Sequence, residues 1–195
     1  MNDIFNEPED ATPLSPEDRR GLIPSYISTR AELNREEQRN ILEAIVWTNE
    51  RRREIVSVDS IRNLHKRMFN KVWEWAGEFS QVADRAIGVQ PYMIGPDLRQ
   101  LTDDVKYWIE HQSYSPDEIA VRFHHRLVQI HPFPNGNGRC SRLAADILIQ
   151  NLGGENFSWG RGDLRSANEM RRMYITALRQ ADQHDFEALI KFARS

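Results

Sequence analysis

Apolar residues recur three or four positions apart along most of the chain, a spacing typical of amphipathic helices. The first stripe consists of Leu33, Ile41, Ala44, Ile45 and Trp47. Its N-terminal cap is Thr29 or Asn34, since both are polar residues that accept hydrogen bonds from helix amides. A second stripe follows Ser60 in "IRNLHKRMFNKVWEWAG", and its spacing predicts a helix that continues until Gly77.

Residues 79–95, "FSQVADRAIGVQPYMIG", interrupt the helical spacing. Gly88, Pro91 and Gly95 disfavour a long helix, while the short apolar runs between them suit extended segments. This stretch therefore predicts a small β-hairpin flap. Pro96 then opens the next helical pattern, "LRQLTDDVKYWIE".

Ser115, followed by Pro116, is a strong start signal for another helix. Its buried stripe is Ile119, Phe123, Leu127 and Ile130. The helix ends at His131–Pro132, a loop follows, and a further helix begins near Asn137 or Gly138. With two more helical patterns near the C-terminus, the chain predicts an all-α fold: a helical bundle with a small β-hairpin flap.

Composition narrows the class of protein. The hydrophobic content of 39% suits one globular domain, and the prolines and acids of residues 1–22 predict a mobile N-terminal arm. A net charge of −3 with scattered Lys and Arg argues against a nucleic-acid partner. No apolar run approaches the roughly 20 residues of a membrane span, so no membrane is expected. A single cysteine, Cys140, and an acidic start favour a cytoplasmic location.

The stretch "HPFPNGNGR", residues 131–139, concentrates the candidate chemistry. A helix that begins among glycines turns unpaired amides and its positive dipole end toward the loop, which favours an anion. Arg139 and Arg142 lie three apart on one helical face, where each can form forked bonds to phosphate. His131 can accept a proton near neutral pH. Together they predict a phosphoryl- or nucleotidyl-transfer site, although each feature alone also occurs as an ordinary turn or cap.

Residues 131–142 resemble the signature of Fic proteins, His-Pro-Phe-x-acid-Gly-Asn-Gly-Arg-x-x-Arg, at all but one defining position. The resemblance extends over residues 55–195 and includes "LHKRMFNKVWEWAGEF" and "FHHRLVQIHPF". The chain is also similar to the subgroup called mobile mystery protein B. The resemblance implies that residues 55–195 form a Fic domain of the Fido type, preceded by an N-terminal helical region at 23–54.

The family resemblance implies an enzyme, a protein adenylyltransferase (AMPylase). It would use ATP with Mg²⁺ to move AMP onto a Ser, Thr or Tyr hydroxyl of a target protein. By this resemblance His131 deprotonates the hydroxyl, Arg139 holds the β-phosphate and Arg142 the γ-phosphate. The residues that would form the anion hole are Gly136, Asn137 and Gly138.

The resemblance also gives roles to segments outside the motif. The flap at Ile87, Gly88 and Val89 would clamp an extended segment of the target by strand addition. Trp159 would lie near the base or ribose, or else cover the surface. Because Fic proteins are often toxins restrained by an inhibitor, a separate inhibitor protein is a further expected partner.

The one departure from the signature is Asn135, where the family has Asp or Glu to hold Mg²⁺. Asparagine keeps a carbonyl oxygen but has no charge, and Mg²⁺ prefers carboxylates, phosphates and water. We therefore expect weakened or altered catalysis. Two alternatives follow: a nucleotide-binding regulatory protein with a degenerate site, or a Fic enzyme that uses another donor, such as UTP or a phosphocholine nucleotide.

The segment "STRAELN" partly matches the inhibitory pattern of many Fic proteins, Ser/Thr-x-x-x-Glu-Gly/Asn. The match gives Ser28 and Glu32, with Leu33 in the Gly/Asn place. The resemblance implies that Glu32 pairs with Arg142 and blocks the γ-phosphate. The alternative is a capping box, in which Glu32 only stabilises the start of a helix.

Overall fold

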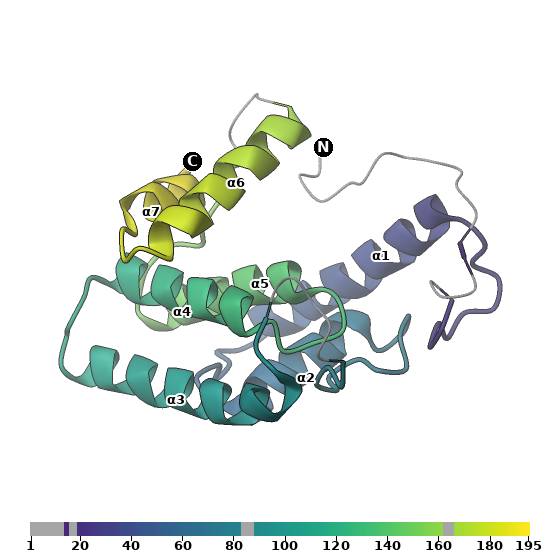
Figure 1. The fold of residues 1–195 in the computed structure, drawn as a ribbon, viewed down its shortest axis with the longest axis horizontal. Coiled ribbons are helices and arrows are strands. Elements are labelled where there is room, and N and C mark those ends of the chain that lie inside the picture. The colour runs from purple at the N-terminus through teal and green to yellow at the C-terminus, as the bar shows by residue number, and fades with distance from the viewer. Residues whose placement is uncertain (1–13, 16–18, 83–87, 162–165) are drawn as a thin grey trace.

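The computed structural model describes residues 14–15, 19–82, 88–161 and 166–195 (Figure 1). Its helices are α1 (Arg30–Asn49), α2 (Val58–Phe69), α3 (Pro91–Glu110), α4 (Pro116–Ile130), α5 (Asn137–Asn151), α6 (Ala167–Ala181) and α7 (Glu187–Arg194). The predicted helical fold class is confirmed. None of the helices in these described ranges combines the length and the hydropathy that a membrane span requires.

The helix pair α4 and α5 forms the centre of the bundle (Figure 1). α3 packs on α4, α2 packs on α5, and α1 packs mainly on α2. α6 and α7 pair with each other, and α7 also contacts α4. The connection between α4 and α5 therefore joins the two central helices of the bundle.

The predicted stripe of α4 is confirmed, since its four apolar residues are at most 3% exposed. Ser115 is the predicted cap: its side chain accepts a hydrogen bond from the Glu118 amide at 3.3 Å, and Pro116 occupies the first turn. At 25 cal/mol per Å² of buried apolar surface, a large aliphatic or aromatic side chain contributes about 1.5–3 kcal/mol. This stripe fixes the orientation of the helix that ends at His131.

The second predicted helix is shorter than its apolar spacing suggested. α2 is capped by Ser57 and ends at Phe69, and the chain then turns as far as Gly77, whose φ is +84°. The expectation of one helix from Ser60 to Gly77 was wrong because Val72 is buried in the turn as well. The side chain of Asn40 holds this turn by accepting the Lys71 amide at 2.9 Å.

α3 begins at Pro91 and not at Pro96. A proline at the first helical position loses no hydrogen bond, because the amide there has no partner within the helix. Ile94 and Leu98 are buried, at 1% and 0% exposure, and their packing retains the helix through Gly95 and Pro96. The glycine and proline signals were therefore misread as helix breakers.

The tip of the predicted flap, including Ile87, lies outside the described residues. Residues 79–82 and 88–90, which flank it, form no strand ladder. The Ser80 amide donates to the Pro132 carbonyl at 2.8 Å, and the Val89 amide donates to the Ile130 carbonyl at 3.2 Å. Both flanks are thus attached to the end of α4.

The predicted N-terminal arm is only partly described. Leu14 is 5% exposed and its amide donates to the Ser28 carbonyl, while Leu22 forms an isolated antiparallel bridge with Trp73. Leu14 and Leu22 are thus packed on the domain. The mobility of the whole arm stays a prediction.

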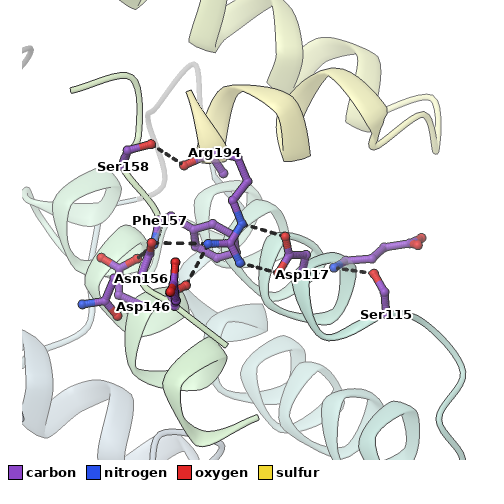
Figure 2. Close-up of polar contacts among 10 residues, drawn as sticks. Ser115, Asp117, Asp146, Asn156, Phe157, Ser158 and Arg194 are labelled. Carbon is purple, nitrogen blue, oxygen red and sulfur yellow. Dashed lines mark hydrogen bonds and ion pairs between the residues drawn. The ribbon is translucent and has the colours of Figure 1, made fainter. Parts of the chain in front are cut away.

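The C-terminal helix is fastened to the start of α4 (Figure 2). Arg194 donates from Nε to Oδ2 of Asp117 at 2.7 Å and from Nη1 to the Glu155 carbonyl at 2.8 Å. Its guanidinium also lies 4.4 Å from the ring centroid of Phe157. These contacts secure the end of the bundle opposite the α4–α5 loop.

The first turn of α1 contains the capping box. Thr29 accepts the Glu32 amide at 3.3 Å, and Oε2 of Glu32 accepts the amides of Ser28 and Thr29 at 2.8 and 3.1 Å. The hydroxyl of Ser28 donates to the same oxygen at 3.0 Å. The hydrogen bond from the Ser28 amide is the main reason that the pKa of Glu32 falls to about 2. Thr29, and not Asn34, is the cap.

Replacing Glu32 tests this cap through its pH dependence. Because the folded protein lowers the pKa of Glu32 from 4.5 to about 2, its stabilisation is present above pH 4.5 and is lost as the pH falls toward 2. Glu32→Gln should therefore lower the melting temperature at pH 7, and the gap from the wild type should narrow at pH 3. Glu36→Gln, on the same helix, is the control. Equal melting temperatures for Glu32→Gln and the wild type at pH 7 would contradict the cap.

Candidate functional site

The loop between α4 and α5 has left-handed backbone at both ends. His131, the C-cap of α4, has φ +53°, and Gly136, the N-cap of α5, has φ +75°. A Cβ atom at Gly136 would lie 2.5 Å from the ring of Phe69. Glycine is required here both for the backbone conformation and for the close approach to α2.

Phe133 and Asn137 lock the loop from within. The Phe133 amide donates to Oδ1 of Asn137 at 2.9 Å, and Nδ2 of Asn137 donates to the Phe133 carbonyl at 2.8 Å. Both residues are buried, at 1% and 4% exposure. The Asn137 side chain thus braces the loop, and its backbone amide is the part that belongs to the helix start.

His131 is half-buried, and its Nδ1 lies 3.3 Å from the Val128 carbonyl. A carbonyl can only accept, so Nδ1 donates and Nε2 is the basic nitrogen of the ring. A Cβ atom at Gly88 would lie 2.9 Å from Cβ of His131. The described flap residues Gly88 and Val89 are therefore neighbours of the candidate base.

One pocket of about 280 Å³ brings the predicted residues together. Its lining includes seven predicted site residues: His131, Asn135, Gly136, Asn137, Gly138, Arg139 and Arg142. α1 supplies the facing wall, with Arg30, Leu33, Asn34 and Glu37. Residues from α1, from α5 and from the loop between α4 and α5 thus surround one polar cavity.

The amides at the start of α5 give this pocket its positive backbone field. Helix geometry leaves the amides of Asn137, Gly138 and Arg139 without a partner within the helix. The Gly136 amide donates to Oδ1 of Asn135 at 2.7 Å. One of the amides that we expect to bind phosphate is thus hydrogen-bonded to the side chain of Asn135.

Arg139 meets a carboxylate from α1 that the sequence did not single out. Its Nη1 lies 2.5 Å from Oε2 of Glu37, and Oε1 of Glu37 accepts the Trp73 indole at 2.6 Å. Glu37 is only 4% exposed. Its position four residues after the buried Leu33 was the available signal, because a carboxylate in the buried register of a helix needs a partner.

Arg142 is half-buried, and its guanidinium lies 5.1 Å from the ring centroid of Tyr174. Burial lowers its pKa to about 10, so it stays protonated at neutral pH. The Tyr174 hydroxyl in turn lies 3.0 Å from Nε2 of the buried His124. A cation–aromatic contact thus holds the second motif arginine beside the pocket.

The residues present fit a magnesium ion poorly. Asn135 is exposed, but its Oδ1 already accepts the Gly136 amide, and the carboxylate in the pocket, Glu37, is paired with Arg139. Across the part of the chain that the structure describes, no three His, Cys, Asp or Glu residues cluster as a metal site. A bound ion would depend on phosphate oxygens for most of its ligands.

His65 on α2 is a further site residue that sequence reasoning missed. Its Nε2 lies 3.0 Å from the Asn135 carbonyl, and its Nδ1 accepts the Gly77 amide at 2.9 Å. The ring stacks on Phe133 with centroids 3.7 Å apart. Burial lowers the pKa of His65 to about 4, although the bond to Asn135 opposes this.

A second pocket, of about 140 Å³, adjoins the first and shares Asn34, Arg139 and Arg142 with it. Its wall is largely apolar and includes Trp159, which is 2% exposed and donates from Nε1 to Asp146 at 3.0 Å. Burial raises the pKa of Asp146 to about 6. The alternative that Trp159 merely covers the surface was wrong.

Comparisons with known proteins give a family match. The model of the Fic/DOC family matches residues 55–149. Protein adenylyltransferase Fic of Drosophila grimshawi is 28% identical over 141 residues, which cover 70% of this chain and 28% of that protein. The chain thus spans less than a third of the length of this curated relative.

Solved structures share the fold. Fic-1 (residues 134–508) of C. elegans has a TM-score of 0.66 at 21% identity, over 93% of this chain and 54% of that one. BepC of Bartonella tribocorum, solved with bound AMPPNP, has a TM-score of 0.67 at 17% identity, over 90% and 95% of the two chains. The helical fold, the loop at the start of α5 and the family match together show that this chain contains a Fic domain of the Fic/DOC family.

Proposed function

We propose that the protein is a Fic-type adenylyltransferase that moves AMP from ATP to a Ser, Thr or Tyr hydroxyl of a target protein. The proposal rests on one observation: a single pocket joins His131 to the start of α5 and to Arg139 and Arg142. The curated relative named as a protein adenylyltransferase supports the reaction class. We extend the proposal to the mobile mystery protein B subgroup on the sequence resemblance alone.

In this reaction Nε2 of His131 accepts the proton of the target hydroxyl. The hydroxyl oxygen forms a bond to the α-phosphorus, the bond between that phosphorus and the α–β bridging oxygen breaks, and pyrophosphate leaves. The amides at the start of α5, with Arg139 and Arg142, stabilise the charge on the phosphates. Gly88 and Val89, which pack beside His131, would guide the target segment.

Removing the base separates chemistry from binding. His131→Ala should lower the rate of AMP transfer by about 10² to 10⁴, the usual contribution of a general base, while ATP affinity changes little. Transfer of label from ATP and a separate binding titration measure the two quantities. His111→Ala, at the exposed end of α3, is the control. Undiminished transfer by His131→Ala would contradict the assigned role.

A second candidate is a nucleotide-binding regulatory protein without useful turnover. Two contacts favour it: Oδ1 of Asn135 is bonded to the Gly136 amide, and Arg139 is paired with Glu37. The pocket then retains its basic groups but offers little to a metal ion. The same assays with UTP or a phosphocholine nucleotide identify an enzyme with another donor.

Restoring the carboxylate distinguishes the two candidates. Asn135→Asp should make AMP transfer more strongly dependent on Mg²⁺, because a charged oxygen binds the ion better than an amide oxygen. If the wild type binds ATP and transfers nothing while the variant transfers AMP, the regulatory candidate is favoured. Identical Mg²⁺ titrations for the variant and the wild type would show that position 135 has no part in metal binding.

We also propose that the pocket is restrained from within, and that Glu37 provides the restraint. Its carboxylate forms an ion pair with the guanidinium of Arg139, and without this pair the guanidinium could bind a phosphate. Glu32, the residue expected from the inhibitory pattern, has its carboxylate engaged by Ser28 and Thr29. Its pairing with Arg142 stays a sequence prediction, as does restraint by a separate inhibitor protein.

Neutralising each glutamate in turn tests the restraint. Glu37→Gln keeps an oxygen that can accept the Trp73 indole but removes the charge beside Arg139. One charge-assisted hydrogen bond is worth about 1.5–3 kcal/mol, so ATP affinity should rise about tenfold or more. Glu32→Gln should leave it near the wild-type value. A larger rise in ATP affinity for Glu32→Gln than for Glu37→Gln would instead assign the restraint to Glu32.

A further inference from the structure

His65 is the point at which α2 reaches the catalytic loop. Its side chain is fully buried, and the next turn of the same helix brings Phe69 against Gly136. The His65 ring stacks on Phe133 with an interplanar angle of 12°. The loop is therefore packed on α2 at two of its positions, 133 and 136.

The two ring nitrogens of His65 have opposite hydrogen-bonding roles. The Gly77 amide can only donate, so Nδ1 is the acceptor at 2.9 Å. The Asn135 carbonyl can only accept, so Nε2 carries the proton and donates at 3.0 Å. One neutral tautomer satisfies both contacts, and the ring thereby joins the turn that ends at Gly77 to the catalytic loop.

The bond to Asn135 also controls a second group. The carbonyl of Asn135 and the amide of Gly136 belong to one peptide unit, and a planar trans peptide points these two groups in opposite directions. A carbonyl held toward His65 therefore turns the Gly136 amide away from α2. There it meets Oδ1 of Asn135, an exposed residue of the pocket wall.

We propose that His65 is a positioning residue that holds the Asn135–Gly136 peptide with its amide facing the nucleotide pocket. A phosphate oxygen can then replace Oδ1 of Asn135 as the acceptor without any rotation of the backbone. This role rests on the proposed nucleotide site. It concerns binding of the phosphates and assigns no chemical step to His65.

A matched pair of substitutions separates the two contacts of the ring. His65→Gln places an amide donor near the position of Nε2 and keeps the bond to Asn135. His65→Asn places an oxygen near the position of Nδ1 and keeps only the bond from Gly77. Both variants lose the aromatic stack, so both should have a lower melting temperature.

ATP affinity, measured well below both melting temperatures, gives the decisive comparison. We expect His65→Asn to bind ATP about tenfold more weakly than His65→Gln, since the hydrogen bond that fixes the orientation of the peptide is lost. Equal affinities for the two variants would overturn the proposal, because a purely structural role affects both alike.

Amide hydrogen exchange keeps this test independent of the proposed function. Without nucleotide, the Gly136 amide should exchange faster in His65→Asn than in His65→Gln, and nitrogen NMR should find the proton of the wild-type ring on Nε2. Failure of the wild type to bind ATP would refute the nucleotide site alone. Equal exchange at Gly136, or a proton on Nδ1, would refute the positioning role.

Discussion

The close packing of the α4–α5 loop on α2 is the constraint on which the rest of the site depends. Gly136 lies so near the ring of Phe69 that no side chain fits, and His65 holds the preceding carbonyl. Interiors of proteins pack densely and deform little, so this contact fixes where α5 begins. The position of the helix start then determines where its amides and arginines face.

Two groups of the pocket that could bind a phosphate chain have partners within the protein. Arg139 is paired with Glu37, and the Gly136 amide is paired with Asn135, two contacts that a phosphate chain would have to displace. Buried groups of this kind need partners, because leaving one unsatisfied costs about 1–3 kcal/mol. In the proposed function, the strength of these two contacts would set the affinity of the pocket for a nucleotide.

Local signals in the sequence were sufficient for α4 and α5. Ser115 and Pro116 marked one start, the glycines around Asn137 marked the other, and the residues of the motif meet in one pocket. The limits of α2 and α3 were misjudged, because the buried Val72 continues the apolar spacing beyond the helix and Pro91 is harmless at a first turn.

The residues that the sequence did not reveal act across long separations in the chain. Glu37 meets Arg139, and His65 meets Asn135, through contacts that exist only once α1, α2 and α5 have packed. Neither pair lies within a window in which spacing or capping carries information. The Glu32 carboxylate shows the converse, since its neighbours along the chain were enough to include the capping box among the two interpretations, and the structure contains it.

The most direct test of the account is a structure of the protein with ATP bound. We predict that the phosphate chain lies against the first amides of α5, with the α-phosphorus facing Nε2 of His131 and Arg139 released from Glu37. Phosphates bound anywhere else, with the Glu37–Arg139 pair intact, would contradict the central claim that the start of α5 is the nucleotide site.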